Sequence, residues 1–159
     1  MDLNVPNKTM ILFVGIQASG KTSFYQKNFP ELVHVSLDEL HTRNKENRLI
    51  DDCLKKGVSF VVDNTNPTAE DRAKYIEKAK TSGFAVYGFY FQSSISACIE
   101  RNSKREGKYR VPRNAIAHTH KVLEMPVYAE GFDRLFYVHL DVQGPVVEDW
   151  TETEQENEI

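Results

Sequence analysis

The sequence predicts a single α/β domain in three layers, a parallel sheet of about five strands with helices on both of its faces. Three observations predict this fold class. Short apolar segments alternate along the chain with longer segments of helical character. A glycine-rich loop follows the first apolar segment. The 159 residues, of which 40% are hydrophobic, suit one core.

Strands are predicted where short runs of β-branched and aromatic residues occur. The first run, residues 9–15 (TMILFVG), is followed by a second at 33–36 and by a third, VSFVVD, at 58–63. A fourth run at 84–91 is rich in aromatic residues, and a fifth spans 134–140. Because helical segments separate these runs, we expect neighbouring strands to be parallel.

Helices are predicted in the segments between the strands. The first follows the glycine-rich loop, and the second is a long polar segment that we expect to form one continuous helix. Helical periodicity is clearest in the third, whose apolar residues are Ala73, Tyr75, Ile76 and Ala79. The five predicted helices span residues 20–28, 38–56, 68–81, 95–103 and 112–124.

Composition excludes some classes of protein. The chain has no apolar run approaching the roughly 18 residues of a membrane span. Its first residues, MDLNVPNKT, lack the apolar segment of a secretory signal. Cys53 and Cys98 form no CxxC pair, so we expect free thiols and a cytoplasmic protein.

Charge is distributed unevenly along the chain. The chain has 20 Lys and Arg against 23 Asp and Glu, a net charge of −3. Residues 148–159 (EDWTETEQENEI) hold six of the acids and no base, so we expect a disordered acidic tail after a domain of residues 1–147. Residues 101–113 (RNSKREGKYRVPR) hold six bases and one acid. The net charge therefore conceals a basic segment that suits an anionic partner.

Residues 15–22, GIQASGKT, match G-x-x-x-x-G-K-[ST] between a predicted strand and a predicted helix. The backbone N–H groups of such a loop, and of the helix that follows, bind phosphate oxygens. We expect Lys21 to contact the β- and γ-phosphates of ATP and the Thr22 hydroxyl to bind Mg²⁺. The sequence lacks the N-K-x-D motif by which GTPases read their base, so a small phosphoryl-transfer kinase is the predicted class.

Two carboxylates follow predicted strands, where parallel α/β sheets place their ligands. Asp38 suits a general base that takes the proton of an acceptor hydroxyl, but it also suits the start of the next helix as a cap. Asp63 suits a carboxylate in the Mg²⁺ shell. The polar residues after it, in DNTNP, suit either an acceptor sugar or phosphate or a simple turn before a helix.

The basic segment 101–113 also has two interpretations. A run of charges is often a solvated surface, whereas a P-loop kinase needs cations that close over the ATP phosphates. Arg101 and Arg105 are four residues apart and share one helix face, and Gly107 is a candidate hinge. We favour a lid over the phosphates.

These motifs together resemble the 5′-hydroxyl polynucleotide kinases, over residues 10–140. GIQASGKT resembles the phosphate loop of that family, VSLDEL its strand-end Asp motif, VVDNTNP its DNTNP motif, and RNSKR followed by VP its lid. LEMPVYAEGFDRLF is similar to the end of the eukaryotic kinase domain. The resemblance implies a P-loop kinase fold and transfer of the γ-phosphate of ATP, with Mg²⁺, to the 5′-hydroxyl of DNA or RNA. It makes Asp38 the general base and puts Arg101 and Arg105 on the phosphates.

The resemblance also implies binding residues, and this chain departs from the family at three of its positions. The family often has Pro at Gln17, commonly has Arg at Leu37, and in some members has at His41 an Arg that grips a substrate phosphate. The expected catalytic residues are Lys21, Asp38, Arg101 and Arg105. The expected ATP-binding residues are Gly15, Gln17, Ala18, Ser19, Gly20, Lys21, Thr22, Ser23, Arg101, Arg105, Val111 and Arg113. The expected acceptor-binding residues are Asp38, His41, Asp63, Asn64 and Arg72, and the expected metal ligands are Thr22 and Asp63.

Two other functions remain open from the sequence. One is a P-loop kinase for a small molecule, with a sugar, gluconate or nucleotide-sugar acceptor. The departures at Leu37 and His41 favour it, and the DNTNP and RNSKR motifs oppose it. The other is a module that binds ATP without catalysis.

Overall fold

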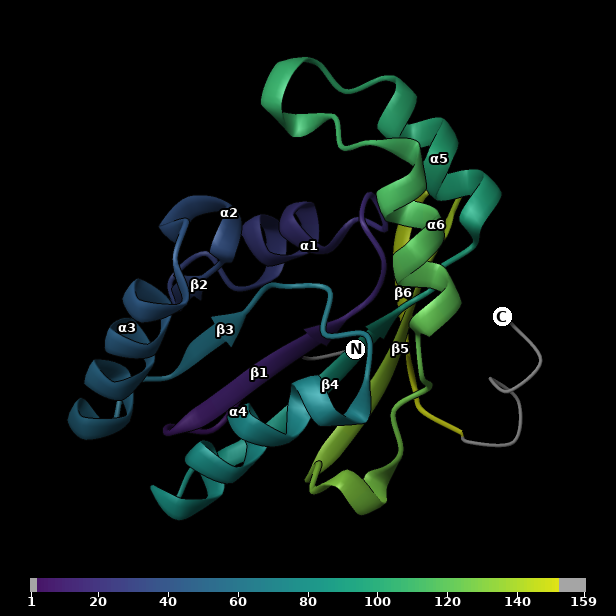
Figure 1. Cartoon of the computed structure of the whole chain (residues 1–159). Helices are drawn as coiled ribbons and strands as arrows, with labels where there is room; N and C mark the ends of the chain where they lie inside the picture. Colours follow the sequence, from purple (N-terminus) through teal and green to yellow (C-terminus); the bar gives the residue numbers. More distant parts are fainter. Residues whose placement is uncertain (1–2, 152–159) are drawn as a thin grey trace.

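The computed structural model describes residues 3–151, whose strands form one sheet (Figure 1). The strands are β1 (Thr9–Val14), β2 (Val33–Val35), β3 (Phe60–Val62), β4 (Ala85–Phe91), β5 (Arg134–Asp141) and β6 (Gly144–Asp149). Their order across the sheet is β2-β3-β1-β4-β5-β6, and the first five are parallel. Strand β6 runs antiparallel to β5. The predicted α/β class and its parallel sheet are confirmed, with one strand more than expected.

The helices cover both faces of this sheet. They are α1 (Lys21–Asn28), α2 (Leu37–Leu40), α3 (Arg43–Lys56), α4 (Ala69–Thr81), α5 (Ile95–Ser103) and α6 (Arg113–Val122), with single turns η1 (Gly107–Tyr109) and η2 (Tyr128–Glu130). Helices α3 to α6 pack into the core on one face, and α1 packs on the other with residues near the N-terminus. No helix within residues 3–151 is long and apolar enough to cross a membrane.

Strand β1 lies in the middle of the sheet and is buried along its whole length. Met10, Leu12 and Val14 point to the core under helices α3 to α6, whereas Ile11 and Phe13 point to the core under α1. A strand covered on both faces is apolar at every position rather than at alternate ones, which explains the unbroken apolar run in the sequence. The loop that follows β1 is therefore carried by a fully buried strand.

The segment 38–56, expected to form one helix, forms two, and that prediction is wrong. Helix α2 ends at His41, which takes the left-handed conformation with φ +70°. Thr42 then caps α3, because its Oγ1 accepts a hydrogen bond from the backbone N–H of Lys45 at 3.1 Å. The break leaves α2 as a separate turn at the end of β2.

The predicted disordered tail begins too early. Residues 148–149 complete β6, and Trp150 is only 5% exposed. The backbone N–H of Trp150 donates to the carbonyl of Leu135 at 3.0 Å, and its ring packs against Tyr90 and Tyr137. Burial of this indole against the sheet stabilises the segment despite its acids, so the domain extends to Trp150. Residues 152–159 of the predicted tail lie outside the described residues.

Candidate active site

The phosphate loop connects β1 to α1 at the carboxyl edge of the sheet. A Cβ atom on Gly15 would lie 2.9 Å from Ser19 Oγ and 3.0 Å from Phe91 Cβ, so no larger residue fits there without a shift. Gly20 precedes α1 in the left-handed conformation, with φ +96°, and Ala18 is also left-handed, with φ +64°. These angles curl the loop between strand and helix, the arrangement that binds phosphate.

Lys21 is the first residue of α1 and is 8% exposed. Its Nζ donates hydrogen bonds to the carbonyl oxygens of Gly15 and Ile16, each at 2.9 Å. Burial lowers the pKa of Lys21, and the charges of Asp63 and Asp38 oppose that shift. The two predicted carboxylates therefore lie near enough to this ammonium group to act on it electrostatically.

Thr22 and Asp63 are brought together from α1 and from the end of β3. The Thr22 hydroxyl donates to Asp63 Oδ2 at 2.8 Å, and the next residue, Ser23, is exposed on α1. A hydroxyl and a carboxylate are the oxygen ligands that Mg²⁺ prefers, and nucleotide phosphates commonly complete its shell. The donor set therefore fits the metal that the sequence predicts.

His34, on β2, belongs to this site and was missed by the sequence motifs. Its Nε2 lies 2.8 Å from Asp63 Oδ2 and its Nδ1 lies 3.1 Å from Glu39 Oε1. The ring stacks on Tyr25, with centroids 4.1 Å apart. Burial alone lowers the pKa of His34, but the hydrogen bond and charge of Asp63, with those of Glu39, outweigh it and raise the pKa above 6.5. The signal in the sequence that could have identified His34 was a polar residue within a short apolar strand.

Asp38 is the second residue of α2 and is exposed. Ser36, rather than Asp38, occupies the cap position before the helix. Within residues 3–151 the Asp38 carboxylate forms no hydrogen bond or ion pair. This carboxylate is therefore available to an acceptor, and no helix N–H group uses it as a cap.

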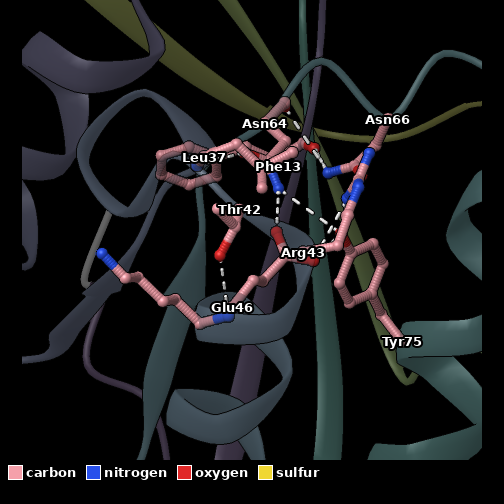
Figure 2. Close-up of polar contacts among 9 residues, drawn as sticks. Phe13, Leu37, Thr42, Arg43, Glu46, Asn64, Asn66 and Tyr75 are labelled. Atoms are coloured by element: carbon pink, nitrogen blue, oxygen red, sulfur yellow. Dashed lines mark hydrogen bonds and ion pairs between the residues drawn. The ribbon is translucent and has the colours of Figure 1, made fainter.

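Asn64 holds the start of α2 in place (Figure 2). Its Oδ1 accepts from the backbone N–H of Leu37 at 3.0 Å, immediately before the candidate base. Its Nδ2 donates at 2.8 Å to Glu46, a fully buried carboxylate on α3. Glu46 also accepts from the Tyr75 hydroxyl at 2.8 Å and from Arg43 Nη1 at 3.1 Å. The Asn64 amide, predicted to bind the acceptor, thus anchors the segment that carries the base.

A hollow of about 250 Å³ lies beside this network, at the end of β3. Arg43 and Lys74 are the cations in its wall, and Asp71 is the acid. Leu37, Asn64 and Tyr75 also line it, among other residues. Its polar wall suits a charged or hydroxylated molecule next to α2. Arg43 and Lys74 lie outside the family motifs, so the sequence offered no signal for them.

Two of the predicted acceptor-binding residues are not part of the hydrogen-bonded network around Asn64 and Glu46. Arg72 is fully buried in α4, where its Nε and Nη2 donate to Glu130 at 2.7 and 3.1 Å. Its Nη1 donates to the carbonyl oxygens of Asn66 and Glu124. A guanidinium that is buried and paired in this way has no surface to offer an acceptor, which contradicts the expected role of Arg72. His41 is exposed at the end of α2.

The two lid arginines approach the phosphate loop from α5 and its C-terminal end. Arg101 Nε donates to the carbonyl oxygen of Ala18, inside the loop, at 2.7 Å. The charge of Arg105 contributes to the lowered pKa of Lys21, after burial as the main cause. The structure therefore bonds Arg101 to the phosphate loop and puts Arg105 near enough to Lys21 to influence it electrostatically.

The base of the lid is closed by hydrogen bonds. Asn102 Nδ2 donates to the carbonyl oxygen of Val111 at 2.8 Å, and the Val111 N–H donates to Asn102 Oδ1 at 3.0 Å. Arg113 then begins α6 and is exposed. Gln17, in the phosphate loop, donates through Nε2 to Thr119 Oγ1 on α6 at 3.0 Å. The loop is thus linked to the helix that follows the lid.

A phosphate loop after the central strand, two carboxylates from neighbouring strand ends and an arginine lid at one edge of the sheet define a P-loop domain of the kinase fold. The model of the AAA_33 family, described as an AAA domain, matches residues 10–126. The chain belongs to that family.

Known relatives agree with the resemblance seen in the motifs. The chain is 28% identical over 131 residues to a bifunctional polynucleotide phosphatase/kinase of Schizosaccharomyces pombe, covering 79% of this chain and 32% of the relative. It is 32% identical over 137 residues to a putative bifunctional polynucleotide phosphatase/kinase of Acanthamoeba polyphaga mimivirus, covering 80% of this chain and 32% of the relative. The chain therefore spans about a third of these relatives, and the predicted likeness to polynucleotide kinases is confirmed.

A solved structure shares this fold. A gluconokinase from Sinorhizobium meliloti superposes with a TM-score of 0.58 and 19% identity, covering 85% of this chain and 84% of that one. At this identity the likeness concerns the fold alone, and it confirms the predicted kinase architecture.

Proposed function

We propose that this protein transfers the γ-phosphate of ATP to the 5′-hydroxyl of a nucleic-acid end. The observation that carries the proposal is the exposed carboxylate of Asp38, unpaired among residues 3–151, at the edge of the sheet that bears the phosphate loop. The names of the relatives suggest the acceptor, since one is named a bifunctional polynucleotide phosphatase/kinase and the other a putative one. The hollow of about 250 Å³ beside α2 has a polar wall that suits a charged or hydroxylated group of the acceptor.

The proposed reaction assigns each group one part. Asp38 accepts the proton of the 5′-hydroxyl, and the acceptor oxygen forms a bond to the γ-phosphorus. The bond from that phosphorus to the β–γ bridging oxygen breaks, and ADP leaves with the electron pair. Lys21 and Arg101, beside the loop, offset the charge on the transferring group. Mg²⁺ held by Thr22 and Asp63 would neutralise phosphate charge when bound.

The test is phosphate transfer from γ-labelled ATP to a panel of acceptors. The panel contains single strands and duplexes with 5′-hydroxyl ends, gluconate and other sugars. We expect label on the nucleic acids. Label on a small molecule alone would favour the small-molecule kinase instead, for which the shared gluconokinase fold is the supporting observation.

Asp38→Asn tests the catalytic role separately. We expect turnover to fall by about 10²–10⁴-fold, because the amide cannot accept the proton, while ATP binding measured by calorimetry stays unchanged. Asp51, an exposed residue of α3 that pairs with Lys78 on α4, provides a control in Asp51→Asn, which should keep full turnover. If neither the wild type nor the variant turned over but both bound ATP, the protein would be a binding module.

A further inference from the structure

The tip of the lid stands apart from the rest of the domain. Figure 1 shows the segment between α5 and α6 projecting beyond the ends of the strands, on the same side as α1 and α2. At the tip, Lys108, Tyr109 and Arg110 are exposed, Tyr109 at 67%. The hydrogen bonds here stay within the lid: Arg105 Nη1 donates to the Tyr109 carbonyl and Arg110 Nε to the Arg105 carbonyl. The Tyr109 ring is therefore a large aromatic surface presented to solvent.

The lid also carries more positive charge than its surroundings compensate. Its one ion pair within the described residues joins Lys104 to Glu100 at 3.7 Å, and both side chains are largely exposed. Lys108 is instead placed over an aromatic ring, with its Nζ 5.4 Å from the centroid of Tyr109. Arg101 is bonded to the phosphate loop and Arg105 is expected on the ATP phosphates, so Lys108 and Arg110 are the cations of this segment that the proposed reaction leaves without a role.

We propose that the lid tip, residues 107–110, binds the single-stranded part of a nucleic acid next to the accepting 5′ end. An unpaired base stacks on the ring of Tyr109, and Lys108 and Arg110 contact backbone phosphates. The proposal deepens the proposed function and rests on it. An aromatic ring flanked by cations is the combination that binds single strands without reading sequence. A duplex does not suit it, because paired bases keep their faces stacked on one another.

The lid and the candidate base lie where both can contact one nucleic-acid strand. Helix α2 follows β2 and helix α5 follows β4, and these strands are parallel in one sheet, so both helices start at its carboxyl edge. Arg101, at the start of the lid, donates to the Ala18 carbonyl in the phosphate loop, and Asp38 and Arg105 both influence the pKa of Lys21 in that loop. A nucleic-acid strand whose 5′ end reaches Asp38 therefore lies at the same edge of the sheet as the lid.

The experiment measures binding of a fluorescent single-stranded oligonucleotide with a 5′-hydroxyl by anisotropy. Tyr109→Ala should weaken binding about 10-fold, because the stacking surface is lost, whereas Tyr109→Phe should bind like the wild type. Lys108→Ala should reduce the slope of log affinity against log salt by about 0.7. Lys55→Ala, which removes an exposed cation at the end of α3, is the matched control and should leave the slope unchanged.

Equal affinity of the wild type and Tyr109→Ala would overturn the proposal, as would tighter binding of a blunt duplex than of the single strand. A second assay compares phosphate transfer to the oligonucleotide and to a nucleoside 3′-phosphate. Tyr109→Ala should lower kcat/KM only for the oligonucleotide. If the wild type labelled both acceptors and the lid variants did the same, the lid proposal alone would fall. If the wild type labelled neither but Tyr109→Ala still lost affinity, the proposed function would fall and the lid site would stand.

Discussion

Glu46 is a single buried carboxylate on which the acceptor side of the site depends. It accepts hydrogen bonds from Asn64, Tyr75 and Arg43, and burial followed by the bond to Glu46 raises the pKa of Tyr75. Glu46→Ala should lower the free energy of unfolding by about 3 kcal/mol, since it leaves buried polar groups without partners. It should also lower kcat more than it changes the KM for ATP, because Asn64 loses its support beside α2. Urea unfolding and steady-state kinetics measure the two effects.

Glu46→Gln is the matched control, since it keeps the shape and one oxygen acceptor. It should retain most of the stability and a larger share of kcat than Glu46→Ala. If Glu46→Ala lost stability but kept the kcat of the wild type, the carboxylate would hold the core without positioning the base.

Protonation of His34, which contacts Asp63, makes the free energy of unfolding depend on pH. It faces Asp63 from β3, Glu39 from α2 and the ring of Tyr25 from α1. Its pKa is raised in the folded state, so its protonated form contributes stability below its ordinary pKa of about 6.5, and that contribution is lost as pH rises through the raised value. The stability advantage of the wild type over His34→Gln should therefore shrink as pH rises. Urea unfolding in EDTA at a series of pH values measures it, and a constant difference would contradict the assignment.

At the scale of elements, the sequence predicted those features of the fold that depend on residues close together in the chain. The phosphate loop and the alternation of strands and helices follow from local patterns, and both are confirmed. Helix α4 shows where this stops: the periodicity included Ala73, which is exposed, and the buried position is Arg72. Arg72 is buried because Glu130, far along the chain, pairs with its guanidinium. Partners that only the fold brings together, such as Glu46 for Asn64, left no local signal.

The two ends of the predicted lid are joined through one side chain. Asn102 is 5% exposed and forms both hydrogen bonds that join the start and the end of the lid. Asn102→Ala should raise the KM for ATP several-fold, because the lid arginines are no longer held near the loop, and should increase proteolysis between residues 103 and 111. Ser103→Ala, which removes an exposed hydroxyl bonded only to the Glu100 carbonyl, should change neither. Unchanged proteolysis in Asn102→Ala would show that the lid closes without this pair.

The whole molecule distributes its charge differently from what the net value of −3 suggests. Two of the acids in the predicted tail, at 148 and 149, belong to the edge strand β6, where Asp149 pairs with Arg134. The bases of the lid stand at the carboxyl edge of the sheet, beside the candidate active site. The acids of β6 therefore do not neutralise the bases beside the candidate active site. The net charge of the chain was no measure of the electrostatic potential at that site.

Trp150 joins the edge strand to the core and is the only tryptophan of the chain. Its ring lies against Tyr90 and Tyr137 in the core between the sheet and the helices, and its Nε1 has no hydrogen-bond partner within the described residues. Trp150→Ala should lower the free energy of unfolding by about 3–4 kcal/mol through the cavity it leaves, and Trp150→Phe should cost less, since it sacrifices no hydrogen bond. Urea unfolding followed by circular dichroism measures both. Val142→Ala, at a fully exposed position of the same hairpin, should stay within about 0.5 kcal/mol of the wild type.

In the wild type, tryptophan fluorescence and circular dichroism should report one coincident transition, because β6 unfolds together with the sheet. An earlier fluorescence transition, or a Trp150→Ala variant as stable as Val142→Ala, would mean that the last strand is attached to the domain without stabilising it.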